Sequence, residues 1–386
     1  MSKYQPAPTL DCMPPAPVRS PVDTDHRSAV PATQMLSPIT IVVRKSEPRP
    51  GPVFDTYWRF AAERQAMFHR RVRGAPWPWT SDPVLREYKF TNPYRATDRV
   101  SQYLIRNVIY PGGFGVRDTV LRTLIFKIFN KIGTWNLLEA VLGPICEASF
   151  DAVAYARVLA RAMDEGAAIY SAAYIMPSGP ASVRRARKHE MHLALLTSLM
   201  QEGFPEKLAQ CKSMADAYGM LLALPGIGPF LAYQFVTDLN YSEFLKFSEL
   251  EFVVPGPGAR DGLRKCFTSL GDYSEADTIR WVTERQHVEF ERRGLIFESL
   301  WGRPLQLIDC QNLFCEVDKY ARVVHPDVSG FTGRTRIKQK YCAHGSVIPL
   351  PWFPPKWNLN ELISPSLSPR QAHLDCRSES EFLRSA

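Results

Sequence analysis

The chain has 386 residues, and its 47 Lys and Arg side chains outnumber its 39 Asp and Glu side chains, giving a formal net charge of +8. Hydrophobic residues make up 45% of the chain, yet no run reaches the roughly 18 consecutive apolar residues of a membrane span. These totals exclude a helical membrane protein and a wholly disordered chain, and the positive charge favours a polyanionic partner.

The ends of the chain differ in composition from its middle. Residues 1–53 are rich in proline and poor in large apolar side chains, which predicts a disordered tail. Residues 54–345 are expected to form the folded body. Residues 346–386 read as an irregular tail, although Trp352, Phe353 and Trp357 predict that its first part packs back on the body.

Apolar side chains three and four apart predict a series of helices between the tails. In chain order they cover residues 55–72, 98–110, 117–132, 134–143, 149–166, 181–203, 206–224, 230–240, 259–270 and 274–294. No regular series of alternating strands interrupts them. The expected fold class is therefore mainly α.

The eight cysteines are scattered along the chain, which is typical of reduced intracellular thiols. Their spacings match zinc sites poorly, so no metal and no cofactor is expected. The N-terminus has no apolar core of the kind that a secretory signal needs. We expect an intracellular protein, nuclear if its source is a eukaryote.

The stretch LPGIGPFLAYQ joins two predicted helices within residues 220–240 through a turn that contains Gly226 and Gly228. Glycine lets another backbone approach closely, and the free N–H groups of the following helix start can bind a phosphate. From this pattern alone, a purely structural turn and a DNA-phosphate site stay equally open. The stretch resembles the helix-hairpin-helix signature of the DNA glycosylase superfamily, which implies a DNA-backbone grip at Gly226 and Gly228.

The hairpin departs from the glycosylase pattern at its chemical positions. Bifunctional members carry a nucleophilic lysine where this chain has Phe230, so no Schiff base is expected there. Counting to the superfamily's acidic residue lands on Ser248, and Glu251 takes the role only if the loop is longer. Asp238 is a second candidate to support attack by water. No closely spaced cysteine run for an iron-sulfur cluster follows.

Three further stretches surround the hairpin: residues 56–110, 250–267 and 305–322. Together with it they resemble the helical domain of 5-hydroxymethyluracil DNA kinases, a group also described as α-glutamyl/putrescinyl-thymine pyrophosphorylases or amino acid:DNA transferases. The resemblance covers roughly residues 54–342. It implies a DNA-base-modifying scaffold from thymine-hypermodification systems, in which a kinase activates the hydroxymethyl group and an amine then displaces it.

A phosphate loop with the spacing GxxxxGKS or GxxxxGKT is absent from the sequence, so the chain is not predicted to be a kinase by itself. The expected partners are DNA, a separate DNA kinase and a small amine or amino-acid donor. The expected function is substitution at the 5-methylene carbon of a thymine-derived base. Two alternatives stay open: a monofunctional glycosylase that uses Glu251 or Asp238, and a non-catalytic reader of modified DNA.

The stretch FTNPYRATDRVSQY carries the candidate pocket residues Asn92 and Tyr94 and the candidate DNA contacts Arg95, Arg99 and Gln102. Arg95 and Arg99 are four apart, so they are expected to share a helix face that contacts phosphates. The alternative is a surface cluster of charges with little energetic effect.

The stretch IDCQNLFCEVDKYAR supplies two candidate catalytic carboxylates, Asp309 and Glu316, and two candidate pocket amides, Gln311 and Asn312. At helical spacing Asp309, Asn312 and Glu316 share one face and can line a pocket. The alternative is a buried network that fastens this helix to the body.

Two more stretches are candidate DNA contacts. GRTRIKQKY offers Arg334, Arg336 and Lys338 to a phosphate backbone. PWPWT, residues 76–80, predicts a rigid aromatic turn over the core, with a base-stacking platform as the alternative.

Overall fold

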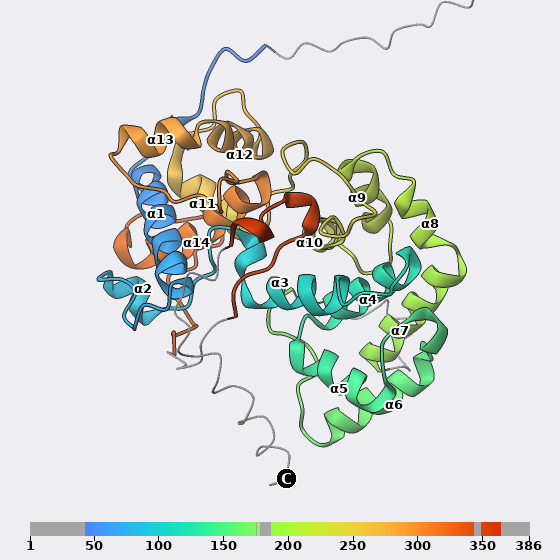
Figure 1. Cartoon of the computed structure of the whole chain (residues 1–386). Helices are drawn as coiled ribbons and strands as arrows, with labels where there is room; N and C mark the ends of the chain where they lie inside the picture. Colours follow the sequence, from blue (N-terminus) through green and yellow to red (C-terminus); the bar gives the residue numbers. More distant parts are fainter. Residues whose placement is uncertain (1–42, 175, 178–186, 343–348, 364–386) are drawn as a thin grey trace, which may run out of the picture. The chain divides into compact units, whose positions relative to one another are not determined.

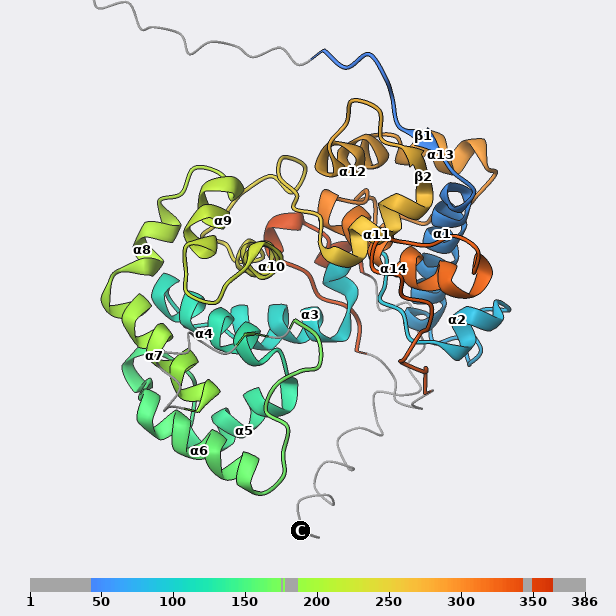
Figure 2. The same cartoon turned by 180° about the vertical axis from the view of Figure 1, so that it is seen from behind.

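The computed structural model describes residues 43–174, 176–177, 187–342 and 349–363, and from Arg44 onward these form one compact unit. Figures 1 and 2 show that unit from opposite sides as an assembly of helices, with one two-stranded sheet in its described part. The prediction of a mainly helical chain is confirmed. No described helix is long and apolar enough to span a bilayer.

One group of elements combines the start of the unit with its C-terminal half. The chain enters through β1 (Arg49–Pro50), α1 (Val53–Val72) and α2 (Pro83–Glu87), and it returns as α11 (Pro257–Cys266), β2 (Phe267–Ser269), α12 (Glu275–Glu284), α13 (Gln286–Arg292) and α14 (Leu307–Val324). β1 pairs antiparallel with β2. α1 packs on α11 and α14, as both views show.

Two glycines allow α11 to lie unusually close to α14. A Cβ at Gly262 would lie 2.0 Å from the carbonyl oxygen of Phe314, and a Cβ at Gly258 would lie 2.3 Å from Sγ of Cys315. Any larger side chain would push the helices apart. The close contact fixes α14, whose polar residues hold the segment before α3.

The second group of elements surrounds α4 (Val116–Phe129). It comprises α3 (Arg99–Tyr103), a π-helical turn (Leu104–Ile109), α5 (Ile132–Leu142), α6 (Ala152–Asp164), α7 (Lys188–Gln201), α8 (Phe204–Ala209), α9 (Met214–Leu222) and α10 (Pro229–Leu239). α4 contacts α5, α7, α8 and α10. Nearly all its side chains are buried, so it is a central helix rather than an amphipathic surface helix.

Several predicted helices are divided in the structure. The prediction of one helix over 206–224 is wrong, because α8 ends at Ala209 and α9 begins at Met214. Ser213 caps α9 by accepting the N–H of Asp216. The one over 274–294 breaks at Arg285 into α12 and α13. The one over 259–270 ends at Cys266, where the chain turns into β2.

The compact unit extends beyond the predicted body, residues 54–345, at both ends. The backbone N–H groups of Lys45 and Ser46 donate to the carboxylate of Asp272, so residues before 54 belong to the compact unit. At the other end Phe353 is fully buried, which confirms that this aromatic cluster packs back on the body. Lys356 donates to the carbonyls of the chain just after α10. Residues 1–42 and 364–386 of the predicted tails lie outside the described residues.

Candidate functional site

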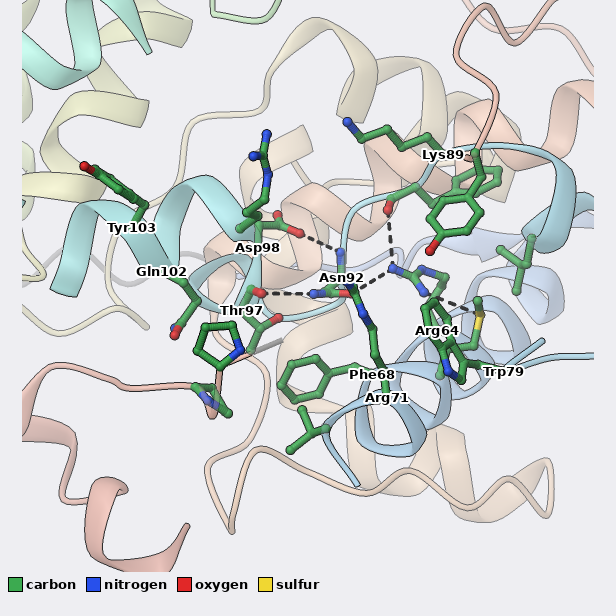
Figure 3. Close-up of a pocket in the computed structure, with 18 of the residues that line it drawn as sticks. Arg64, Phe68, Arg71, Trp79, Lys89, Asn92, Thr97, Asp98, Gln102 and Tyr103 are labelled. Atoms are coloured by element: carbon green, nitrogen blue, oxygen red, sulfur yellow. Dashed lines mark hydrogen bonds between the residues drawn. The ribbon is translucent and has the colours of Figure 1, made fainter. Parts of the chain in front are cut away.

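A cavity of about 730 Å³ opens between α1, the chain from Tyr88 to Asn107, and the segments around Tyr341 and Leu350. We call it the Arg64 cavity (Figure 3). Its aromatic walls are Phe68, Trp77, Trp79, Tyr88, Phe90, Tyr103 and Tyr341. Its cationic side chains are Arg64, Arg71, Lys89, Arg99, Arg106 and Lys340. One carboxylate, that of Asp98, is among the residues that line it.

Arg64 organises the floor of the cavity from within α1. Its guanidinium donates to the carbonyl oxygens of Phe90 and Thr91 and, at 2.7 Å, to Oδ1 of Asn92. Burial lowers the pKa of Arg64 below its ordinary value, although Asp98 and Glu316 oppose that shift. The arginine therefore holds the chain from Phe90 to Asn92 against α1, and Figure 3 shows its bond to Asn92.

Asp98 places a half-buried carboxyl group in the lining of the cavity. Its Oδ1 accepts the backbone N–H of Asn92 at 2.9 Å. Burial raises the pKa of Asp98 to about 7, and the nearby Glu316 adds to the rise, while that hydrogen bond and Arg64 oppose it. A carboxyl group with this pKa exchanges protons readily near neutral pH.

Asn92, predicted as a pocket residue, and Gln102, predicted as a DNA contact, both line the Arg64 cavity, and their amides are already bonded within the protein. Asn92 accepts from Arg64 and donates to the carbonyl of Thr97. Gln102 donates to the carbonyls of Ala96 and Trp352 and accepts the N–H of Trp352. These two amides shape the cavity. Among its cations, Arg106 also donates to the carbonyl of Leu350 and Lys340 pairs with Glu87, whereas Lys89 and Arg99 are exposed.

The prediction that Arg95 and Arg99 share an exposed helix face is wrong. Arg99 is exposed at the start of α3, whereas Arg95 lies in a preceding short helical turn and is 3% exposed. Arg95 makes a two-pronged ion pair with Asp238, and Lys127 contacts the same carboxylate at 2.7 Å. Burial alone would raise the pKa of Asp238, but the two cations lower it below its ordinary value. Neither Arg95 nor Asp238 therefore offers a free group to DNA or water.

The polar face of α14 fastens the cavity floor. Asp309 accepts the backbone N–H of Arg95 at 2.8 Å and that of Gln306 at 3.0 Å. Glu316 accepts the N–H of Thr91 at 3.0 Å and pairs with Lys319 at 2.7 Å. These bonds support the alternative interpretation of this face, a buried network rather than a catalytic wall.

Four more predicted residues lie away from the Arg64 cavity. Tyr94 is buried and donates its hydroxyl hydrogen to the carbonyl of Arg303 at 2.6 Å. Gln311 is buried on α14, next to the half-buried Asn312. Glu251 is exposed, and its backbone oxygen accepts from Arg280. Glu251 is thus exposed, whereas Asp309 and Glu316 are buried on α14.

The predicted hairpin is present between α9 and α10. Ile227 donates its N–H to the carbonyl of Leu224, and Gly226 has a φ of +77° that favours glycine. Gly226 and Gly228 are both exposed, and a Cβ at Gly228 would meet nothing within 4 Å. A phosphate can therefore reach the backbone at this turn.

The basic segment that includes Arg334, Arg336 and Lys338 leads to the cavity. All three side chains are exposed. Lys340, further along, forms an antiparallel bridge with Tyr88, and Tyr341 stacks on Trp77 with ring centroids 4.9 Å apart. The segment thus joins an exposed line of cations to the aromatic wall.

Sequence reasoning did not identify Arg64, Arg71 or Lys89 as site residues, and it gave Asp98 no catalytic role. Arg64 and Arg71 lie seven residues apart on one helix, and nothing local distinguishes them from surface arginines. PWPWT did contain a usable signal, because Trp77 and Trp79 both line the cavity.

Comparison with known proteins finds a matching family model and a curated relative. A family model described as "5-hmdU DNA kinase, helical domain" matches residues 51–330. A curated relative, a 5-hmdU DNA kinase of Bacillus phage SP10, is 26% identical over 301 residues, which cover 72% of this chain and 46% of the relative. The chain thus spans about half the length of that relative. No solved structure matches, so the glycosylase-like hairpin fold stays a prediction. Because the family model matches more than half of its residues, the chain belongs to the family of 5-hmdU DNA kinase helical domains.

Proposed function

We propose that this chain binds DNA containing 5-hydroxymethyl-2′-deoxyuridine (5-hmdU) and takes part in the further modification of that nucleoside. The Arg64 cavity is the place where the nucleotide lies. The observation that carries the proposal is the combination of aromatic walls, several cations and the carboxylate of Asp98 in one cavity. Aromatic faces stack on a base, and cations neutralise its phosphates.

The cations are placed so that a DNA strand can follow them. Arg334, Arg336 and Lys338 lie on the exposed segment that ends at the cavity, and Arg99 and Lys89 are exposed at its rim. The glycines of the α9–α10 turn offer a second contact to the backbone. A nucleotide held at these points must leave the base stack to enter a cavity of this size.

The modification that we propose is substitution at the 5-methylene carbon. A separate kinase first converts the hydroxyl group into a phosphate-type leaving group. The amine nitrogen then forms a bond to the methylene carbon, and the carbon–oxygen bond breaks with its electron pair on the departing phosphate. The proton that the new ammonium nitrogen loses passes to the carboxylate of Asp98, whose pKa of about 7 allows the transfer.

The test is mass spectrometry of nucleosides from 5-hmdU DNA incubated with the full chain, a DNA kinase, ATP and a mixture of amino acids and polyamines. We expect a heavier, amine-bearing nucleoside that requires all the components. Release of free base would establish a glycosylase instead. Unchanged DNA in the presence of tight binding would establish a non-catalytic reader, and either result overturns the substitution.

DNA binding itself has a separate prediction. Replacing Arg334, Arg336 and Lys338 together by glutamine is expected to weaken binding to duplex DNA of any sequence, because phosphate contacts carry no sequence information. Each lost contact lowers the slope of log affinity against log salt by about 0.9, so the slope should fall by about 3. Fluorescence anisotropy at several salt concentrations measures both quantities.

A matched variant controls for net charge. Three exposed cations on the α6 to α9 side of the unit are replaced by glutamine: Arg157, Lys207 and Lys212. This variant loses the same charge and should keep most of the salt slope. Equal losses of affinity and salt slope in the two variants would show that the basic segment makes no specific contact with DNA.

A further inference from the structure

Tyr174 places its ring flat on the hairpin helix α10. The ring stacks on that of Phe230 with centroids 5.6 Å apart and planes only 8° from parallel. Tyr174 has a φ of +55°, a left-handed conformation that residues other than glycine rarely adopt. Strain of this kind persists only where the surroundings fix it, and it concentrates at functional positions.

Two buried amides next to this stack have unsatisfied polar atoms. Gln234 and Gln311 are fully buried, and among the described residues Nε2 of Gln234 and Oε1 of Gln311 have no hydrogen-bond partner. Gln234 lies one helical turn after Phe230. The amide of Gln311 and the ring of Phe230 both border Gly256, at 3.5 and 2.8 Å from where its Cβ would lie.

The unpaired atom of Gln234 is a donor, and the amide of Gln311, which no hydrogen bond among the described residues orients, can turn its oxygen or its nitrogen towards a ligand. The bond from Nε of Arg95 to Oε1 of Gln234 at 3.2 Å fixes the orientation of that amide, so its Nε2 is the free donor. Leaving a polar group buried without a partner is unfavourable, because the group has lost its hydrogen bonds to water. A ligand that supplies both partners would recover this loss.

The same place carries excess positive charge. Nζ of Lys127 lies 4.7 Å from the centre of the Tyr174 ring. Lys127 and Arg95 share the single carboxylate of Asp238, so two cations face one anion. Electron-rich groups, such as the carbonyl oxygens of a base, are favoured beside such a cluster.

We propose that the ring of Tyr174 occupies a closed binding site for a pyrimidine base of DNA. Phe230 is the stacking floor, and Gln234 and Gln311 read the base edge, because each pyrimidine presents an acceptor and a donor side by side. The six-membered ring that must be displaced matches a pyrimidine rather than a purine. This site is distinct from the Arg64 cavity, and it rests on the proposed function only in taking its base from DNA.

The test replaces Tyr174 by glycine, which adopts the same φ without strain and removes the ring. Thymidine and deoxyadenosine are titrated into the full wild-type chain and the variant by calorimetry, with the Gln234 side-chain amide followed by NMR. Stacking on an aromatic ring is worth about 1–3 kcal/mol, so opening the site should tighten thymidine binding by about 5- to 150-fold. The Gln234 amide signal should shift on binding, and deoxyadenosine should gain less.

The matched second variant adds Gln311→Leu to Tyr174→Gly and should lose the gain for thymidine. The proposal is overturned if Tyr174→Gly binds thymidine no better than the wild type. It is also overturned if both nucleosides gain equally and Gln311→Leu changes nothing, because the variant then contains only a hole. If the wild type still binds duplex DNA with a salt-dependent affinity, only the closed site has failed. If it does not bind duplex DNA, the proposed function has failed.

Discussion

Replacing Asp238 by asparagine is expected to lower the free energy of unfolding by about 3–5 kcal/mol, because it leaves two buried cations without their anion. Arg95 and Asp238 are 4% and 1% exposed at their side chains, and Lys127 is 3% exposed. Asparagine has nearly the same shape, so the loss measures charge and not packing. Urea unfolding followed by circular dichroism gives the difference.

The difference in unfolding free energy between the wild type and Asp238→Asn depends on pH through Asp238 and Lys127. The pKa of Asp238 is lowered in the folded chain, so its contribution is present above the ordinary aspartate value of 3.8 and is lost as pH falls further. Burial lowers the pKa of Lys127, and without Asp238 that shift grows. The free energy of unfolding that Asp238→Asn loses should therefore become smaller as pH rises towards the ordinary lysine pKa of 10.5.

An exposed ion pair provides the control for Asp238→Asn. Asp164 pairs with Arg187 at 3.2 Å, and both side chains are about half exposed or more. Asp164→Asn should change stability by less than about 1 kcal/mol. Equal effects of the two substitutions would show that burial does not decide the strength of the Asp238 cluster.

The helices of this fold were predictable from the sequence, whereas their internal breaks were not. Periodicity marks an apolar face, and it continues across Ser213 and Arg285, where local capping and not hydrophobicity ends a helix. α4 shows the opposite limit. It exposes no polar face because other helices surround it. That environment depends on the tertiary structure and cannot be seen in a short stretch of sequence.

The candidate site was predictable in its segments but not in the roles of its residues. FTNPYRATDRVSQY does border the Arg64 cavity, yet Arg95 points inward to Asp238, which lies 143 positions later in the chain. Only the fold decides that the arginine next to it in the pattern, Arg99, is the exposed one. Arg64 was missed for the same reason, because its partners Phe90 and Asn92 are distant in sequence.

Replacing Asp98 by asparagine is expected to reduce kcat/KM for the proposed amine substitution by about 10²–10⁴-fold, the usual contribution of a general base. Asparagine keeps an oxygen that accepts the N–H of Asn92, so the cavity floor stays in place. The wild-type rate should rise with pH and level off near the pKa of about 7. The rate of the variant should not depend on pH in this range.

Stability separates this loss of activity from unfolding. The pKa of Asp98 is raised in the folded chain, so its stabilising contribution is full below the ordinary value of 3.8 and is lost as pH rises through about 7. At pH 8 the ionised Asp98 is therefore unfavourable, and Asp98→Asn should be at least as stable as the wild type. Asp151, which caps α6 from an exposed position, is the matched control, because asparagine caps equally well. Asp151→Asn should keep full activity, and a pH profile unchanged in Asp98→Asn would remove Asp98 from the chemistry.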